Sequence, residues 1–261
     1  MPVERVLARA RGWHGADGAL PFAAHEAQLA GLAVGDVAWG RLTPMYWHVG
    51  ADHLTALPLR LQERDEQDAR ALFEAVQPLF TSQGWLLVWL RADYWLTAHE
   101  SLDGLPTASL DRVAGRNPDA WMPDHPQARA IKLLQNEAQM LWYTHPVTDE
   151  RVARGEMPIN SLWLSDCGMH QAANANVLER VDTLRDSLWN NDWDAWVQAW
   201  SAVDREVARP LVAKMRAGER FKLTLGGERH ARTWSTRRRP WWTRITQPRA
   251  TYDVAGVLRS L

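Results

Sequence analysis

Ten residues with side chains suited to binding or catalysis lie in two stretches of the chain. They are Glu137, His145, Arg151, Asn160, Ser165, Asp166, Cys167, His170, Glu228 and Arg229. Backbone amides after Ser165, together with the charge of Arg229, would suit a phosphate or a carboxylate. Asp166 and Glu228 would repel such a group unless a cation or further arginines offset them. The set therefore predicts a pocket for a small anionic ligand whose identity stays open.

Two of these candidates also have a structural interpretation. Cys167 could be a nucleophile at a helix amino end, where the thiolate is favoured, but a single half-buried cysteine is more often part of the packing. Glu137 could line a polar pocket with His145, or it could be a buried, hydrogen-bonded group that joins a helix to a strand. The sequence contains none of the GxSxG, P-loop, CxxC and HExxH motifs, and no catalytic residue can be assigned.

The spacing of apolar residues around these candidates changes from that of helices to that of a strand. Pro126 can begin a helix whose apolar residues recur at three-to-four spacing, and Pro146 ends it. A short helix is expected over 148–153, with Thr148 as its N-cap and Gly155 at its end. A buried strand over 161–165 follows, and a Ser-Asp-Cys-Gly loop leads from it to another helix.

The amino-terminal part predicts an α+β half. Residues 1–35 are expected to be mostly helical, and alternating apolar residues predict hairpins around Gly50 and over Trp85–His99. An amphipathic helix over Arg64–Ser82 lies between the hairpins. The Gly- and Pro-rich segment that follows is expected to be a wrapping loop. We therefore expect an α+β half over residues 1–125 and an α/β half over 126–261, which could still form one compact domain.

The carboxyl-terminal half predicts a βαβ arrangement. Helices are expected over Val177–Trp189 and Trp193–Met215, and the second carries a stripe of tryptophan and valine that is typical of a core. The next strand is Phe221–Leu225, so the order implies two parallel strands joined by a right-handed helical crossover. Their carboxyl ends would bring Ser165–His170 and Gly226–Arg229 into one crevice. An antiparallel or distant placement of the two strands would contradict this crevice.

Composition predicts a globular protein. The chain of 261 residues is 46% hydrophobic and 23% charged, which is enough for a sizeable core. With 30 basic and 31 acidic residues, its net charge of -1 disfavours a protein that coats nucleic acid or an anionic membrane. The single cysteine excludes an internal disulfide, and the amino terminus has no apolar targeting stretch. These features predict a bacterial-type cytoplasmic protein.

One segment, residues 229–249, has nucleic-acid character, because it contains seven arginines and no carboxylate and is interleaved with tryptophans. Arg237, Arg238 and Arg239 beside Trp241 and Trp242 could grip phosphates and stack on bases. The same residues could cap helices and neutralise acids elsewhere on a nearly neutral protein. We favour the second interpretation, so nucleic acid is not an expected partner.

A family resemblance is carried by two stretches, NEAQMLWYTHPVTDERVARGEMPINSLWLSDCG and KLTLGGER. They resemble a bacterial family described either as cofactor-independent phosphoglycerate-mutase-like or as RpfE-type regulatory protein. Archaeal-type mutases have a similar run, and the matching residues here are His145, Pro146, Val147, Arg151, Gly155, Asn160, Trp163 and Leu164. The resemblance implies the alkaline-phosphatase-like fold. The expected fold is therefore α/β, with a mostly parallel or mixed sheet flanked by helices.

The resemblance also implies a reaction, the movement of a phosphoryl group by a Ser or Thr nucleophile between two divalent cations. Two segments correspond to the metal ligands. DWDAWVQAW has no His, and KLTLGGERH has Gly227 and Glu228 where an Asp-His pair is expected. Four scattered residues could be remnants of the ligand set: His170, Asp192, Asp194 and His230. We therefore expect no cofactor and a non-catalytic or regulatory protein that binds a ligand. The alternative is an active, divergent cofactor-independent phosphoglycerate mutase with Mn or Zn.

Overall fold

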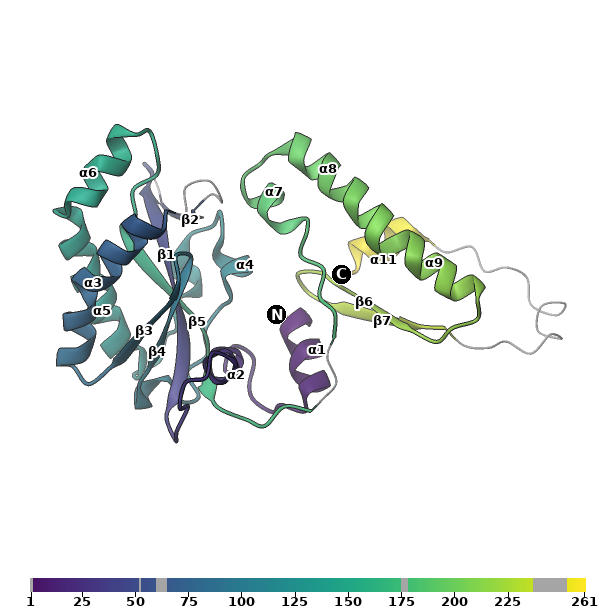
Figure 1. Ribbon diagram of the computed structural model, residues 1–261, viewed down its shortest axis with the longest axis horizontal. Helices are drawn as coiled ribbons and strands as arrows, with labels where there is room; N and C mark the ends of the chain where they lie inside the picture. The colour runs from purple at the N-terminus through teal and green to yellow at the C-terminus, as the bar shows by residue number, and fades with distance from the viewer. Residues whose placement is uncertain (1, 52, 60–64, 175–177, 237–252) are drawn as a thin grey trace, which may run out of the picture. The chain divides into compact units, whose positions relative to one another are not determined.

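The computed structural model (Figure 1) describes residues 2–51, 53–59, 65–174, 178–236 and 253–261. The chain divides into two compact units, one of residues 8–178 and one of residues 1–7 with 179–261. These bounds differ from the predicted halves, because strand β5 (Ser161–Met169) pairs with strand β1 (Ala38–Val49) across position 125. The predicted wrapping loop therefore lies inside one unit.

Residues 8–178 contain a five-stranded sheet in which every described pair is antiparallel. The long strand β1 is central: β5 pairs along one edge, and β4 (Tyr94–Ala98) and β2 (Leu54–Pro58) pair with successive parts of the other edge. Strand β3 (Leu86–Arg91) lies outside β4. Both predicted hairpins, β1–β2 and β3–β4, are confirmed.

The predicted parallel arrangement is wrong. Strand β5 runs antiparallel to β1, and β6 (Lys222–Gly226) pairs with β7 (Ala231–Ser235) in a separate two-stranded sheet of the other unit. The order strand, helix, strand suggested a crossover, but the long-range pairing with β1 determines where β5 lies. Among the described residues neither a parallel sheet nor the crevice between two parallel strand ends is present.

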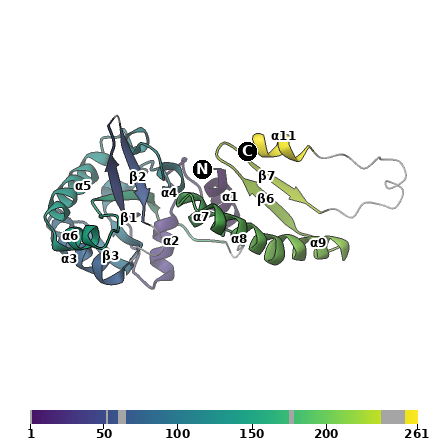
Figure 2. The same ribbon diagram turned by 90° about the horizontal axis from the view of Figure 1, so that it is seen from above.

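Helices cover both faces of the five-stranded sheet. Helices α3 (Glu66–Ser82) and α5 (Ala128–Tyr143) lie on one face, and α2 (Phe22–Leu29) and the short α4 (Leu110–Val113) lie on the other (Figure 2). The α3–α5 side contains the largest core cluster, in which the indole of Trp142 donates a hydrogen bond to the Leu72 carbonyl at 3.1 Å. On the α2 side, three buried alanines of α2 pack on Trp39 and Leu96.

Helix α6 (Pro146–Ala153) connects α5 to β5 and differs at its start from the prediction. His145, and not Thr148, is the N-cap, and its Nδ1 accepts a hydrogen bond from the Val147 amide at 3.3 Å. The predicted Ser-Asp-Cys-Gly loop is also wrong, because β5 continues to Met169 and includes these residues. Two 3-10 turns, η2 (Glu100–Leu102) and η3 (Pro118–Trp121), complete the unit.

The second unit is smaller and has little buried surface. Its helices are α7 (Arg185–Trp189), α8 (Trp193–Val203), α9 (Arg209–Arg216) and α11 (Val254–Arg259), with a π-turn, η4 (Asp204–Ala208), between α8 and α9. Helix α1 (Pro2–Arg11) begins in this unit and ends in the other. No described residue of α8, η4 or α9 is buried. The tryptophan stripe is therefore not core in this structure, contrary to its sequence-based interpretation.

None of the described helices combines the length with the apolar content that crossing a bilayer requires.

Candidate functional site

The end of β5 lies directly against the start of α2. A Cβ added to Gly168 would lie 3.2 Å from the Cα of Pro21, so only glycine allows this approach without a shift of the backbone. Seven polar residues from α2, β1, β4 and the end of β5 gather beside this contact. We call them the α2–β5 seam: His25, Glu26, Gln28, Arg41, Tyr94, Asp166 and His170.

A charged cluster forms the centre of the seam. The Arg41 guanidinium pairs with Glu26 at 2.6 Å and with Asp166 at 2.9 Å. The Tyr94 hydroxyl donates a hydrogen bond to the second oxygen of Glu26, and the guanidinium lies 4.7 Å from the centre of the Tyr94 ring. The side chains of Arg41, Glu26 and Asp166 are 30%, 24% and 13% exposed, so the cluster is open to solvent on one side.

The backbone of Asp166 is unusual. Its φ of 61° is in the left-handed region, which a non-glycine residue seldom adopts. The pairing of β1 with β5 explains it: Trp39 faces Gly168 and Arg41 faces Ser165, so Asp166 and Cys167 together face only Gly40. This β-bulge turns the Asp166 carboxylate toward Arg41. Bulges and strained residues of this kind are frequent beside ligand sites.

The cluster controls the protonation of its members. Burial works against the charge of Arg41, but the Asp166 and Glu26 carboxylates outweigh burial and raise its pKa above the ordinary value. Burial, followed by the hydrogen bond to Glu26, raises the pKa of Tyr94. Arg41 therefore stays charged, and Tyr94 stays protonated as a donor, over the physiological pH range.

The other end of the seam contains two histidines. His170 Nε2 lies 3.0 Å from Gln28 Oε1 and donates to it. The His25 ring meets the Trp13 ring edge-on, with centroids 5.1 Å apart. The pKa of His25 is lowered, first by burial and then by Arg11 and His170, whereas Glu26 acts in the opposite direction. His25 is therefore largely neutral at pH 7.

The structure brings Asp166 and His170 into the seam, and Ser165 lies buried beside them as the partner of Arg41 in the strand register. Cys167 is also buried, and burial raises the pKa of its thiol. A raised pKa disfavours the thiolate, which supports the packing interpretation of this cysteine. The seam thus contains two of the predicted candidates, Asp166 and His170.

Four other candidates lie elsewhere in the same unit. Arg151 is fully buried and pairs with Asp68 of α3 at 2.9 Å. Asn160 binds the backbone of Trp47 in β1 through both atoms of its side-chain amide. Glu137 is exposed on α5 and receives a 3.5 Å hydrogen bond from Gln83. His145 caps α6. Arg151, Asn160 and His145 therefore have structural contacts, whereas Glu137 lies on the surface of α5.

The last two candidates, Glu228 and Arg229, are exposed in the turn between β6 and β7 of the smaller unit, where the Arg229 amide donates to the carbonyl of Leu261. The arginine-rich candidates Arg237, Arg238 and Arg239 lie outside the described residues. The predicted convergence of Ser165–His170 with Gly226–Arg229 on parallel strand ends is contradicted by the antiparallel sheet.

Sequence reasoning missed five members of the seam, which are His25, Glu26, Gln28, Arg41 and Tyr94. A signal was present for Arg41, because it is the single charged residue in the otherwise apolar run AWGRLTPM. A charge in a buried strand usually needs a partner. The partners themselves come from three other elements and share no sequence spacing with Arg41.

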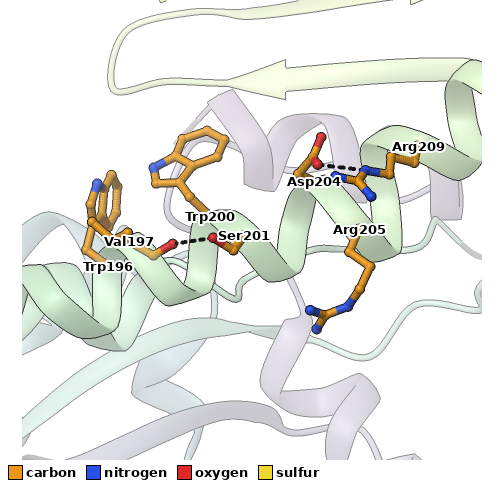
Figure 3. Close-up of a pocket in the computed structure, with 7 residues that line it drawn as sticks. All are labelled: Trp196, Val197, Trp200, Ser201, Asp204, Arg205 and Arg209. Atoms are coloured by element: carbon orange, nitrogen blue, oxygen red, sulfur yellow. Dashed lines mark hydrogen bonds and ion pairs between the residues drawn. The ribbon is translucent and has the colours of Figure 1, made fainter.

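The smaller unit has an open groove of about 560 Å³ along α8 and η4 (Figure 3). The Trp196 and Trp200 rings project from the same side of α8 with centroids 5.9 Å apart, and the Asp204–Arg209 ion pair follows at 2.8 Å. The full lining is Trp196, Val197, Trp200, Ser201, Asp204, Arg205 and Arg209. None of the ten predicted candidates lines this groove.

Within the described part of the chain, no group of three or more His, Cys, Asp or Glu residues is arranged to hold a metal ion. The four possible remnants, His170, Asp192, Asp194 and His230, are not part of any such group. The described residues therefore do not fit the two-metal site that a mutase reaction requires, and no chemical step is assigned to one.

No protein-family model matches the chain, and no curated protein matches it. Among solved structures, it is similar to the cofactor-independent phosphoglycerate mutase from Thermoplasma acidophilum DSM 1728, with 17% sequence identity and a TM-score of 0.38. The match covers 52% of this chain and 38% of that chain, so it spans well under half the length of that protein. The similarity to a phosphoglycerate mutase is thus weak and partial.

Proposed function

We propose that this chain is a phosphoglycerate-mutase-like regulatory protein that binds a small anionic ligand in the α2–β5 seam without converting it. The observation that carries the proposal is the left-handed Asp166, held at a bulge against Arg41. A strained residue persists only where the surrounding structure fixes it, and such residues concentrate at ligand sites. Relationship to the mutases and to their alkaline-phosphatase-like fold is part of the proposal and rests on the sequence motif.

The motif residues support the non-catalytic part of the proposal. His145 caps α6, Arg151 is buried against Asp68, and Asn160 binds the backbone of β1. Gly155 ends the turn after α6 with a φ of 75°. Each of these roles is structural, because the polar atoms are occupied by backbone groups or by a buried carboxylate. We therefore attribute the motif to the conformation that α6 and β5 adopt, and not to a catalytic role.

The alternative function is a divergent, cofactor-independent phosphoglycerate mutase that uses Mn or Zn for phosphoryl transfer. A third possibility, nucleic-acid binding through residues 229–249, depends largely on positions outside the described residues. The seam favours the first proposal over both, because it contains protonated donors and a fixed guanidinium but no described metal-ligand set.

Calorimetry with the full chain tests the proposal. We expect saturable binding of 3-phosphoglycerate, and we expect Arg41→Met to weaken it at least tenfold because the seam loses the ion that orders its carboxylates. Arg129→Met, on the exposed surface of α5, is the matched control and should bind like the wild type. Absence of binding would contradict the proposal. Two tightly held Mn or Zn ions per chain, with conversion to 2-phosphoglycerate, would establish the mutase alternative instead.

A further inference from the structure

Two neighbouring aromatic rings carry buried nitrogens that lack a hydrogen-bond partner among the described residues. They are Nε1 of Trp13, whose side chain is only 3% exposed, and Nδ1 of His25. The two rings pack edge-on, with centroids 5.1 Å apart. Most buried polar atoms in native proteins have a partner, so two unpartnered nitrogens at one place indicate a group that the protein itself does not supply.

The chemistry of the nitrogens restricts that group. An indole N–H can only donate, so the partner of Trp13 must be an acceptor. The ring of His25 can donate from Nδ1, and it does so from both nitrogens once it is protonated. A water molecule, a carboxylate and a phosphate can each accept a hydrogen bond from these nitrogens. The charges around the two rings discriminate between water and an anion.

Those charges are predominantly positive. The Arg11 guanidinium lies 5.2 Å from the centre of the Trp13 ring. The pKa of His25 is lowered first by burial and then by Arg11 at the end of α1 and by His170, which follows β5. The acidic neighbour, Glu26, is paired with Arg41. Converging donors and cations favour an anion over water.

The backbone holds the loop of Arg11 and Trp13 beside the end of β5. The Asn174 amide donates to the Arg11 carbonyl at 2.8 Å. The Gln171 side chain accepts from the His14 amide at 2.9 Å and donates to the His14 carbonyl at 2.7 Å. One main-chain bond before Trp13 and two bonds from the Gln171 side chain after it therefore hold this loop.

We propose that Trp13, His25, Arg11 and His170 form a subsite for the phosphate or carboxylate group of a small ligand. The subsite deepens the proposed function and rests on it, because it assigns the anionic end of the ligand to the histidine end of the seam. The Arg41 cluster, which contains two carboxylates and one guanidinium, is not part of this subsite. Inorganic phosphate alone should occupy the subsite.

The test follows the indole N–H resonances of the full chain, labelled with 15N-tryptophan, during titration with inorganic phosphate at pH 6.0. Trp13→Phe identifies the Trp13 resonance by its disappearance. We expect that resonance to shift saturably, and we expect Arg11→Gln and His25→Gln each to weaken phosphate at least fivefold. Arg112→Gln is the matched control, because Arg112 lies over Trp121 at 5.3 Å in the same unit. Titration with glycerate, which lacks the phosphate, separates carboxylate from phosphate recognition.

Three outcomes would overturn the subsite: no shift with phosphate or glycerate, an equal shift with sodium chloride, or unchanged affinity in both variants. If Trp13→Phe does not fold, the phosphate affinities of the Arg11 and His25 variants still show whether phosphate binds at the subsite. Binding of 3-phosphoglycerate that leaves Trp13 and both variants unaffected would refute the subsite and leave the proposed function standing. A phosphate-induced shift at Trp13 without any preference for 3-phosphoglycerate would refute the proposed function and leave the subsite standing.

Discussion

At the scale of single residues, Asn160 shows how one side chain fixes two segments that are far apart in the sequence. Its Oδ1 accepts from the Trp47 amide at 2.7 Å, and its Nδ2 donates to the Trp47 carbonyl at 3.0 Å. The side chain thus continues the pairing of β1 beyond the first residue of β5. The partner lies 113 positions away in the sequence, so no local pattern identifies it.

Replacement of Asn160 by alanine should lower the free energy of unfolding by about 1–3 kcal/mol, because two backbone groups of Trp47 lose their partner. Urea denaturation followed by tryptophan fluorescence measures the loss. Asn136→Ala, at an exposed position on α5, is the control and should be neutral or slightly stabilising, since alanine favours helix. An unchanged midpoint for Asn160→Ala would show that Asn160 is free to contact a ligand.

His25 should make stability depend on pH. Because its pKa in the folded state is below the ordinary value of 6.5, the folded state binds this proton less readily than the unfolded state. Its contribution is therefore complete above about pH 6.5 and is lost as the pH falls through the folded pKa. Urea denaturation at pH 7.5, 6.5 and 5.5 should show a smaller acid loss for His25→Gln than for the wild type. Equal losses in the two proteins would disprove this role.

At the scale of elements, helix α6 is fastened to α3 by a buried ionic network. Arg151, fully buried, pairs with Asp68 at 2.9 Å and donates to the Met157 carbonyl at 2.9 Å. Arg154 also pairs with Asp68 but is 42% exposed. The network brings the end of α6 to the amino-terminal turn of α3, where a carboxylate is favoured by the helix dipole.

Arg151→Met should lower the free energy of unfolding by about 3 kcal/mol, since it removes a buried cation and leaves the Met157 carbonyl without that donor. Arg154→Met is the matched control. It removes a solvent-exposed partner of the same carboxylate and should cost clearly less than Arg151→Met, because exposed ion pairs contribute little to stability. Thermal and urea unfolding measure both variants. Equal losses of unfolding free energy in the two variants would mean that the burial of Arg151 does not add to the stability of the network.

The elements themselves were partly predictable. The helix at α3 and the two hairpins follow from local periodicity, and the structure confirms them. The seam was not predictable, because it depends on the register of β1 against β5 and on a bulge that no spacing reveals. The tryptophan stripe of α8 has the period of a core helix, but periodicity does not reveal whether a partner surface is present.

At the scale of the whole molecule, the two units differ in how much they bury. The four core clusters lie within residues 8–178, whereas no described residue of α8, α9 or α11 is buried. The predicted division at residue 125 relied on glycine and proline content. It could not anticipate that β5 would pair with β1, because that contact is long-range.

Hydrogen exchange of the intact chain should reflect this difference. Amides of β1, β4 and β5 should exchange at least a hundredfold more slowly than amides of α8 and α9, because helices without buried side chains open locally at little cost. Mass spectrometry of peptides from the exchanged protein gives the comparison. Similar protection of both sets would show that the smaller unit is stabilised by a surface that covers it.

The central claim, that the chain binds a small anionic ligand and does not convert it, is tested most directly by 31P NMR of 3-phosphoglycerate with the intact protein and Zn. The proposal predicts that the 3-phosphoglycerate resonance shifts or broadens saturably, that Arg41→Met abolishes most of the change, and that no 2-phosphoglycerate resonance appears on prolonged incubation. A growing 2-phosphoglycerate resonance, or a spectrum that the protein leaves unchanged, would contradict it.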